Sequence, residues 1–158
     1  MSVENLILRE VVSVFLKADN GSFLMQLRDD IPSIVFPDHW GLFGGTIESG
    51  ESVCEAASRE LEEEIALRII PKEIVKFRQY LQSNYRVHTC FHHLKTPISI
   101  LNLQEGVDFG LFSINEILTG RLFSQKFNAY FPVAHPLIGY FRDLSNIDKQ
   151  AVLLRLTS

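Results

Sequence analysis

Cysteine is scarce in this 158-residue sequence, which contains only Cys54 and Cys90. Two cysteines cannot build the disulfide framework of a small secreted domain, and they favour a reducing compartment such as the cytoplasm. The sequence also lacks an apolar run of the roughly 18 residues that a membrane-spanning helix requires. Its first stretch, MSVENLILRE, carries acidic residues where a signal peptide has basic ones. We therefore expect a cytoplasmic protein with no membrane partner.

An excess of basic residues is missing as well. The 15 lysines and arginines against 19 aspartates and glutamates give a formal charge of −4, whereas a surface that coats nucleic acid is strongly basic. We expect no nucleic-acid polymer as a partner, but a single nucleotide is compatible because a metal ion can bring phosphate to an acidic site. No repeat, low-complexity tract or linker divides the sequence, so we predict one domain over residues 1–158.

Runs of apolar and β-branched residues predict the strands. They lie over residues 10–17, 23–28, 73–82, 85–94 and 98–103. Asn20-Gly21 joins the first two as a hairpin turn, and the glycine-rich stretch WGLFGG predicts a further short strand. The runs over 73–82 and 85–94 are predicted to pair in antiparallel orientation.

Capping patterns predict the helices. Ser52 and Ser113 each precede a glutamate by three residues, which is the spacing of a capping box. A last amphipathic helix is predicted over residues 135–144. Because strands and helices alternate along the chain, the fold class is predicted to be α/β, a sandwich on a mixed β-sheet.

The helix predicted from Ser52 to Leu67 has an unusual distribution of glutamates. At roughly 100° per residue, Leu61 and Ile65 lie on its apolar stripe, while Glu55 and Glu62 lie on the opposite side. The remaining glutamates share an arc of about 100° at the border of the apolar stripe; they are Glu60, Glu63 and Glu64.

Three carboxylates in this position need a compensating cation. Like charges repel, and partial burial of a carboxylate adds to the cost. Arg59 can compensate one of them, whereas a hard divalent ion such as Mg²⁺ suits several carboxylate oxygens. On the helix alone, a solvated charged face is the simpler interpretation.

With the preceding loop, the segment resembles the Nudix box of the Nudix (MutT-like) hydrolases. Gly45 is followed after five residues by Glu51 and after seven more by Arg59-Glu60. Leu61, the pair Glu63-Glu64 and Leu67 complete the pattern, and WGLFGG is similar to the strand that leads into the box. The resemblance implies a Nudix-type α/β/α sandwich. Ala66 stands where the family has glycine, so we expect the helix to run on to about Arg68.

The resemblance also implies a chemistry. Nudix enzymes typically hydrolyse a diphosphate linkage in a nucleoside diphosphate derivative, with Mg²⁺ or Mn²⁺ and with water as nucleophile. It assigns Glu60, Glu63 and Glu64 as metal ligands, with Glu105 of a later loop as a further ligand or general base. The catalytic set is then Glu63, Glu64, Glu105 and Arg59, in which Arg59 orients a glutamate of the box, Glu51 first of all.

Substrate contacts are assigned in the same way. They fall on a basic residue near the phosphates, on the glycines of the loop and on an aromatic ring that stacks on a base: Arg28, Gly44, Gly45 and Trp40. A plain surface arginine, an exposed loop carboxylate at Glu105 and a core tryptophan are the alternatives.

Other interpretations remain open. His88, Cys90 and His92 alternate along one predicted strand, but on a straight strand they spread over about 13 Å. A solvent-facing side of the strand is therefore preferred to a zinc site. A catalytically inactive nucleotide-binding module and an isopentenyl-diphosphate isomerase-like enzyme are the alternatives to a hydrolase. The substrate (a nucleoside triphosphate, a nucleotide sugar or ADP-ribose) depends on loops over 29–39, 80–86 and 121–136, and the chain is a monomer or a homodimer.

Overall fold

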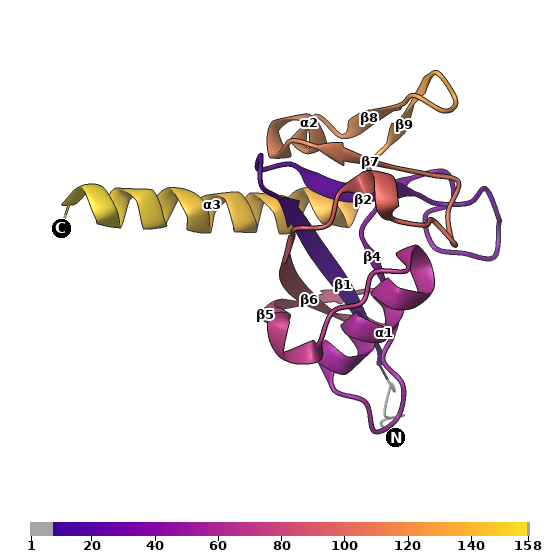
Figure 1. Ribbon diagram of the computed structural model, residues 1–158, viewed down its shortest axis with the longest axis horizontal. Coiled ribbons are helices and arrows are strands. Elements are labelled where there is room, and N and C mark those ends of the chain that lie inside the picture. The colour runs from indigo at the N-terminus through magenta and orange to yellow at the C-terminus, as the bar shows by residue number, and fades with distance from the viewer. Residues whose placement is uncertain (1–7, 158) are drawn as a thin grey trace, which may run out of the picture. The chain divides into compact units, whose positions relative to one another are not determined.

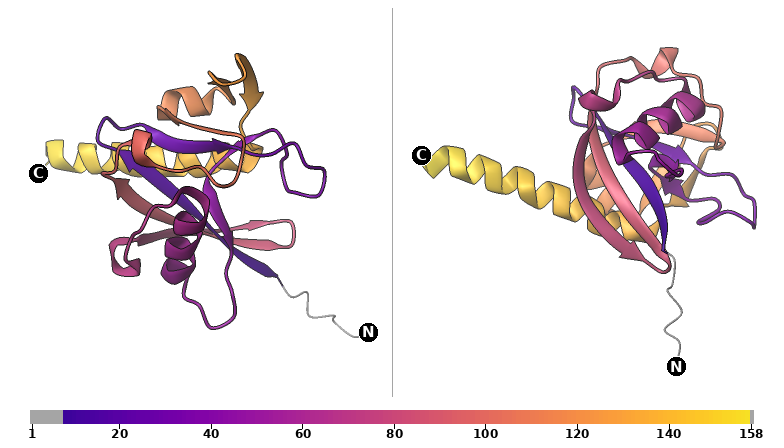
Figure 2. Two further views of the ribbon diagram at one scale, coloured as in Figure 1. Left: turned by 45° about the vertical axis from the view of Figure 1, so that its right-hand side comes forward. Right: turned by 90° about the horizontal axis from the view of Figure 1, so that it is seen from below.

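The computed structural model describes residues 8–157, with side chains up to residue 147. Within this range the chain divides into two compact units (Figures 1 and 2). Unit 1 comprises residues 8–20 and 42–105, and unit 2 comprises residues 21–41 and 106–157.

Unit 1 contains four strands and one α-helix. The strands are β1 (Arg9–Ala18), β4 (Phe43–Thr46), β5 (Val75–Gln82) and β6 (Tyr85–Leu94), and the helix is α1 (Val53–Ile65). β1 pairs with β4 in antiparallel and with β6 in parallel orientation, and β6 pairs with β5 in antiparallel orientation. The strand order is thus β4-β1-β6-β5. This arrangement confirms a mixed sheet and the predicted antiparallel pair over 73–94.

Apolar packing holds α1 against this sheet (Figure 2). Three residues of its predicted stripe, Ala57, Leu61 and Ile65, have no exposed surface. In the centre of β1 the consecutive residues Phe15 and Leu16 are both fully buried, which shows that the strand is covered on both faces. Side-chain burial of this kind contributes roughly 1.5–3 kcal/mol for each large residue.

The C-terminal end of α1 differs from the prediction. Ala66 adopts a left-handed conformation (φ 56°, ψ 31°) and ends the helix, so the expectation that alanine would let it run on is wrong. The N–H of Ala66 donates to the carbonyl of Glu62 (3.0 Å) and the N–H of Leu67 to that of Leu61 (3.2 Å). Leu67 is buried, so its packing and these bonds offset the roughly 1–2 kcal/mol that a left-handed alanine costs.

The predicted strand over 98–103 is also wrong. Its first residues form a 3₁₀ turn, Ile98–Ile100. The segment then runs along the end of α1, where the N–H groups of Asn102 and Gln104 donate to the last two carbonyls of the helix (3.1 and 2.8 Å). The apolar run pairs with a helix end instead of a strand because those carbonyls have no partner within the helix. A second 3₁₀ turn, Pro71–Glu73, leads into β5.

Unit 2 contains the remaining elements. They are β2 (Phe23–Leu27), β3 (Trp40–Gly41), β7 (Asp108–Phe112), α2 (Ile114–Leu118), β8 (Arg121–Ser124), β9 (Ala129–Pro132) and α3 (His135–Thr157). β2 pairs with β3 and β7, and β8 pairs with β9, all in antiparallel orientation. Ser113 and Glu116 form the predicted capping box of α2. α3 begins as predicted but extends well beyond residue 144.

The core of unit 2 is aromatic. Phe23 packs edge-to-face on Phe141 of α3, with ring centroids 5.1 Å apart. Trp40 is fully buried, and its indole N–H donates to the carbonyl of Leu122 (3.0 Å). Among residues 8–157, no helix is both long and apolar enough to cross a bilayer.

Candidate active site

The loop before α1 approaches its neighbours so closely that it needs glycine at two positions. A Cβ added to Gly44 would overlap the carbonyl oxygen of Val12 on β1, and one added to Gly45 would overlap the carboxylate of Glu60. The helix then begins behind Ser52, whose hydroxyl accepts a hydrogen bond from the N–H of Glu55 (3.1 Å). This cap sets the residue at which α1 begins, and with it the orientation in which the second and third turns face the loop.

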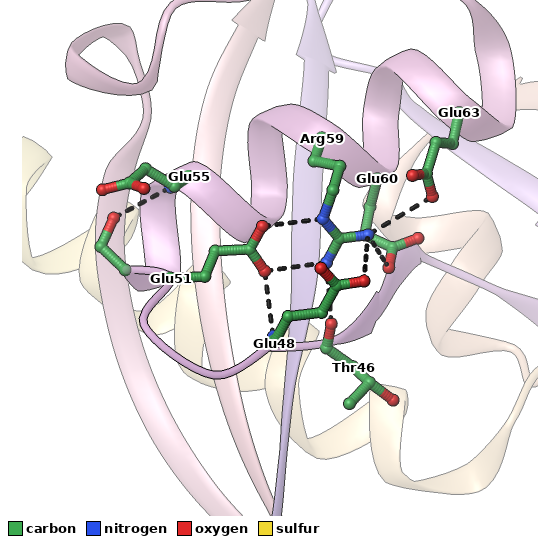
Figure 3. Close-up of polar contacts among 8 residues, drawn as sticks. Thr46, Glu48, Glu51, Glu55, Arg59, Glu60 and Glu63 are labelled. Atoms are coloured by element: carbon green, nitrogen blue, oxygen red, sulfur yellow. Dashed lines mark hydrogen bonds and ion pairs between the residues drawn. The ribbon is translucent and has the colours of Figure 1, made fainter.

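Arg59 ties the loop to the helix (Figure 3). Its Nε and Nη2 donate to the two carboxylate oxygens of Glu51 (2.7 and 2.8 Å), so the structure pairs Arg59 with the partner named from the sequence. Nη2 also donates to the Thr46 carbonyl (3.0 Å), and Glu51 accepts a further bond from the N–H of Glu48 (3.0 Å). The bonds from Arg59 and from the Glu48 N–H lower the pKa of Glu51 to about 2, because they favour its charged form.

The same guanidinium also faces the glutamates of the helix. Nη1 donates to Glu60 (2.9 Å) and makes a longer contact with Glu63 (3.4 Å). Burial raises the pKa of Glu60 in spite of Arg59. Glu63 is mostly exposed, so this single long contact restrains it only weakly. The single positive charge of Arg59 is thus shared by several carboxylates, and only the charge of Glu51 is fully compensated.

Glu64 is the most deeply buried of these carboxylates. Only 2% of its surface is exposed, and its Oε2 accepts a hydrogen bond from the N–H of Gly44 (3.2 Å). Burial, and then the nearby carboxylates of Glu105 and Glu60, raise the pKa of Glu64 to about 9. The three carboxyl groups of Glu60, Glu64 and Glu105 therefore form one cluster on the inner side of α1, which we call the inner cluster.

Glu105 reaches the inner cluster through the backbone. It directly follows Gln104, whose N–H is bonded to the carbonyl of Glu64 (2.8 Å). The segment over 98–103, predicted as a strand, thus leads into the backbone bond that positions Glu105. No local pattern indicates these backbone bonds, nor the roles of the Thr46 carbonyl and the Glu48 N–H.

The carboxylates are not already arranged as a coordination sphere. Among the described residues, no group of three or more His, Cys, Asp or Glu side chains converges as metal ligands. Arg59 lies at one side of this group, where its Nη1 donates to Glu60 and makes a long contact with Glu63. The donor set still fits a hard divalent cation, because the carboxyl groups of the buried Glu64, the partly buried Glu60 and the exposed Glu105 lie near one another with one arginine beside them.

The two substrate residues outside this segment belong to unit 2. Trp40 is a core residue with no exposed ring, so the prediction that it stacks on a substrate is wrong. Its indole packs on Phe112 instead, with centroids 4.9 Å apart. Arg28 follows β2, and its buried Nε has no hydrogen-bond partner. A buried guanidinium nitrogen without a partner is unfavourable until an acceptor binds it.

The side chains of His88, Cys90 and His92 on β6 have separate surroundings. His88 contacts Glu10 (3.2 Å), and Nδ1 of His92 lies 3.1 Å from the carbonyl oxygen of Glu73. Cys90 is fully buried, so the interpretation that this side of β6 faces solvent is wrong for Cys90. α1 packs against this strand.

The comparison with known families decides the identity of the fold. The family model described as NUDIX domain matches residues 7–131, which is most of the chain. This chain belongs to the Nudix family. The match includes residues of both units and the whole of the box.

Individual Nudix relatives agree. Nucleoside triphosphatase NudI of Escherichia coli O139:H28 is 38% identical over 66 residues, which cover 42% of this chain and 45% of that protein. The matched segment thus spans less than half of that relative. A MutT protein from Methanosarcina mazei has the same fold (TM-score 0.67, 18% identity, 89% of this chain and 95% of that one). So does a mutT/nudix family protein from Listeria innocua (TM-score 0.65, 18% identity, 92% and 97%).

Proposed function

We propose that this Nudix protein is a divalent-metal-dependent pyrophosphohydrolase that uses water to cleave a diphosphate linkage in a nucleoside diphosphate derivative. The observation that carries the proposal is the inner cluster, in which the exposed Glu105 and the partly buried Glu60 lie close to the buried Glu64, with a single arginine bonded to Glu60. Carboxyl groups so placed are unfavourable unless a cation binds them. The name of the E. coli relative, a nucleoside triphosphatase, supports a nucleoside triphosphate as the first substrate to test.

Mg²⁺, with Mn²⁺ as the alternative, is the proposed cofactor. Glu60, Glu63, Glu64 and Glu105 would hold it, because the first three lie on successive turns of α1 and the fourth is delivered beside Glu64. When bound, such an ion neutralises phosphate charge and lowers the pKa of water.

The other residues of the segment position these ligands. Arg59 locks Glu51 and the Thr46 carbonyl, so the loop stays fixed relative to the helix. The N–H of Gly44 orients Glu64, and the missing side chain of Gly45 leaves room for Glu60. Glu63 is mostly exposed and makes only one long contact with Arg59, which suits it to accept the proton of water. Glu64 and Glu105 are the other candidates for the general base.

Arg28 is the proposed phosphate contact of unit 2. Its unsatisfied buried Nε supports this role, since a guanidinium binds phosphate through charge-assisted hydrogen bonds. We also propose that both units act as one Nudix domain, because the family match includes residues of each. The proposed partner is a small nucleotide. A nucleotide sugar and ADP-ribose are the alternatives to a nucleoside triphosphate.

A hydrolysis panel tests the proposal. Purified protein with Mg²⁺ is offered nucleoside triphosphates, nucleotide sugars and ADP-ribose, and released phosphate or pyrophosphate is measured. Glu63→Gln should lower turnover by about 10³-fold or more. Glu62→Gln is the matched control, because Glu62 is the neighbouring residue but is exposed and paired with Arg68 (3.1 Å). It should stay within about twofold of wild type.

Three results would contradict the proposal. Equal turnover in wild type and Glu63→Gln would remove the glutamates from the chemistry. Tight nucleotide binding without hydrolysis of any panel member would indicate a binding module. Conversion of isopentenyl diphosphate, measured in parallel, would indicate an isomerase.

A further inference from the structure

The two cysteines of the chain, far apart in sequence, meet in unit 1. Cys54 lies in the first turn of α1 and Cys90 in the middle of β6. The thiol of Cys54 donates to the carbonyl of Ile74 (3.5 Å), directly before β5. Two residues later Lys76 of β5 is paired with Cys90 of β6. The bond to Ile74 therefore holds Cys54 over the strand pair that contains Cys90.

The environments of the two thiols differ. Cys54 is only partly buried, whereas Cys90 has no exposed surface, and both are free. Burial raises the pKa of Cys90 to about 12, and the neighbouring Cys54 adds to the shift. A thiol with so high a pKa is a poor first target for an oxidant.

We propose that Cys54 and Cys90 form an intramolecular disulfide when the folded protein meets a peroxide. The accessible Cys54 reacts first: its thiolate attacks one peroxide oxygen, the O–O bond breaks, and Cys54 becomes a sulfenic acid with release of one water. The sulfur of Cys90 then attacks the sulfur of Cys54, the S–S bond forms, the S–O bond breaks, and a second water leaves. Two thiols and one hydrogen peroxide thus give one disulfide and two waters.

This site is independent of the proposed hydrolysis. Cys54 precedes the glutamates of the box along α1, and Cys90 lies on β6. The disulfide would join the first turn of the helix to the sheet and close a loop of about 35 residues. Such a loop stabilises a folded chain mainly by restricting the unfolded one. In the reducing compartment that we propose from the free cysteines, the pair stays a dithiol until an oxidant appears.

Oxidation of the full-length protein tests the proposal. The protein is treated with hydrogen peroxide under native conditions, and free thiols, intact mass and peptides are measured before and after dithiothreitol. Both thiols should disappear together, the mass should fall by two hydrogens, and one peptide pair should link Cys54 to Cys90. The Tm should rise by about 5–10 °C and return after reduction.

Cys54→Ser and Cys90→Ser are the controls, each checked for folding by its Tm before oxidation. Cys54→Ser should keep its buried thiol under the same peroxide dose, and Cys90→Ser should accumulate sulfenic acid at Cys54 without a gain in Tm. Oxidation in denaturant separates proximity from reactivity, because the linked monomer should form much faster in the folded chain. Wild-type protein that gains sulfinic acid at Cys54 while Cys90 stays free, or that links only between chains, would overturn the proposal.

Discussion

The two sides of α1 carry the same residue type in opposite settings. Glu62 on the outer side is exposed and pairs with Arg68, which is more exposed still. Glu64, two residues further on, is 2% exposed, bonded to the Gly44 N–H and surrounded by other carboxyl groups. The glutamates of one run can therefore have different environments, because the helical period places one of them in water and another in a cluster that needs a cation.

The largest effect should appear in the pH dependence of the metal-free protein. The pKa of Glu64 is raised to about 9 in the folded state, so the stability that its proton contributes is present below pH 4.5 and is lost as the pH rises through 9. Glu64→Gln removes this loss and should raise the free energy of unfolding at pH 8 by on the order of 3–5 kcal/mol relative to its effect at pH 4.

Urea unfolding in EDTA at both pH values measures this difference. Glu62→Gln is the control from the outer side and should change stability by less than about 0.5 kcal/mol at either pH. Parallel wild-type and Glu64→Gln profiles between pH 4 and 9 would show that the inner carboxylate is not destabilised, and the contrast between the two sides would fail.

Metal removal should give the next largest effect. A cation that binds only the folded state stabilises it by about 2.7 kcal/mol at a concentration 100 times its Kd. Saturating Mg²⁺ or Mn²⁺ should therefore raise the Tm of wild type and of Glu62→Gln at pH 8, and EDTA should reverse the rise. Glu64→Gln should lose most of this shift. An equal shift in all three proteins would place the ion elsewhere.

The two arginines should differ next. Arg59 makes a bidentate pair with the mostly buried Glu51 and also bonds Thr46, whereas Arg68 makes one contact in water. Arg59→Lys should lower the free energy of unfolding by about 2 kcal/mol, because lysine cannot reproduce the fork. Arg68→Lys should cost less than about 0.5 kcal/mol. Thermal unfolding compares them, and a similar cost for both would refute the contrast.

The smallest effect should come from the end of the helix. Ala66→Gly relieves a left-handed alanine and should stabilise the protein by about 0.5–1 kcal/mol. Ala57→Gly, in the buried helix interior, should destabilise it by about 1 kcal/mol or more. Destabilisation by Ala66→Gly would show that the left-handed residue carries no strain.

Much of the fold followed from local patterns. The strands on either side of Asn20-Gly21, the antiparallel pair β5 and β6, and the starts of α1 and α2 lie where the residue periods and caps place them. The pairing of Arg59 with Glu51 was also expected, because the spacing of the box brings the loop back to the helix. Each of these features depends on residues close in sequence or on one helix face.

The errors share one cause, which is long-range contact. The run over 98–103 has the apolar character of a strand, but N–H groups in and directly after it donate to carbonyls at the end of α1 that have no partner within the helix. The predictions that Trp40 stacks on a substrate and that Cys90 faces solvent are wrong because the core of each unit covers these residues. Burial and backbone partners depend on elements that pack from elsewhere in the chain, and no single stretch of residues encodes them.

The sequence by itself determined that this chain has a Nudix box, a charged helix with an apolar stripe, and too few cysteines for a disulfide framework. Only the tertiary structure decided that α1 stops at Ala66, that Glu105 joins Glu60 and Glu64, and that Cys54 lies over the strand pair that contains Cys90. The physical reason is that periodicity and capping act over one or two helical turns, whereas desolvation and the meeting of distant side chains exist only once the chain has packed.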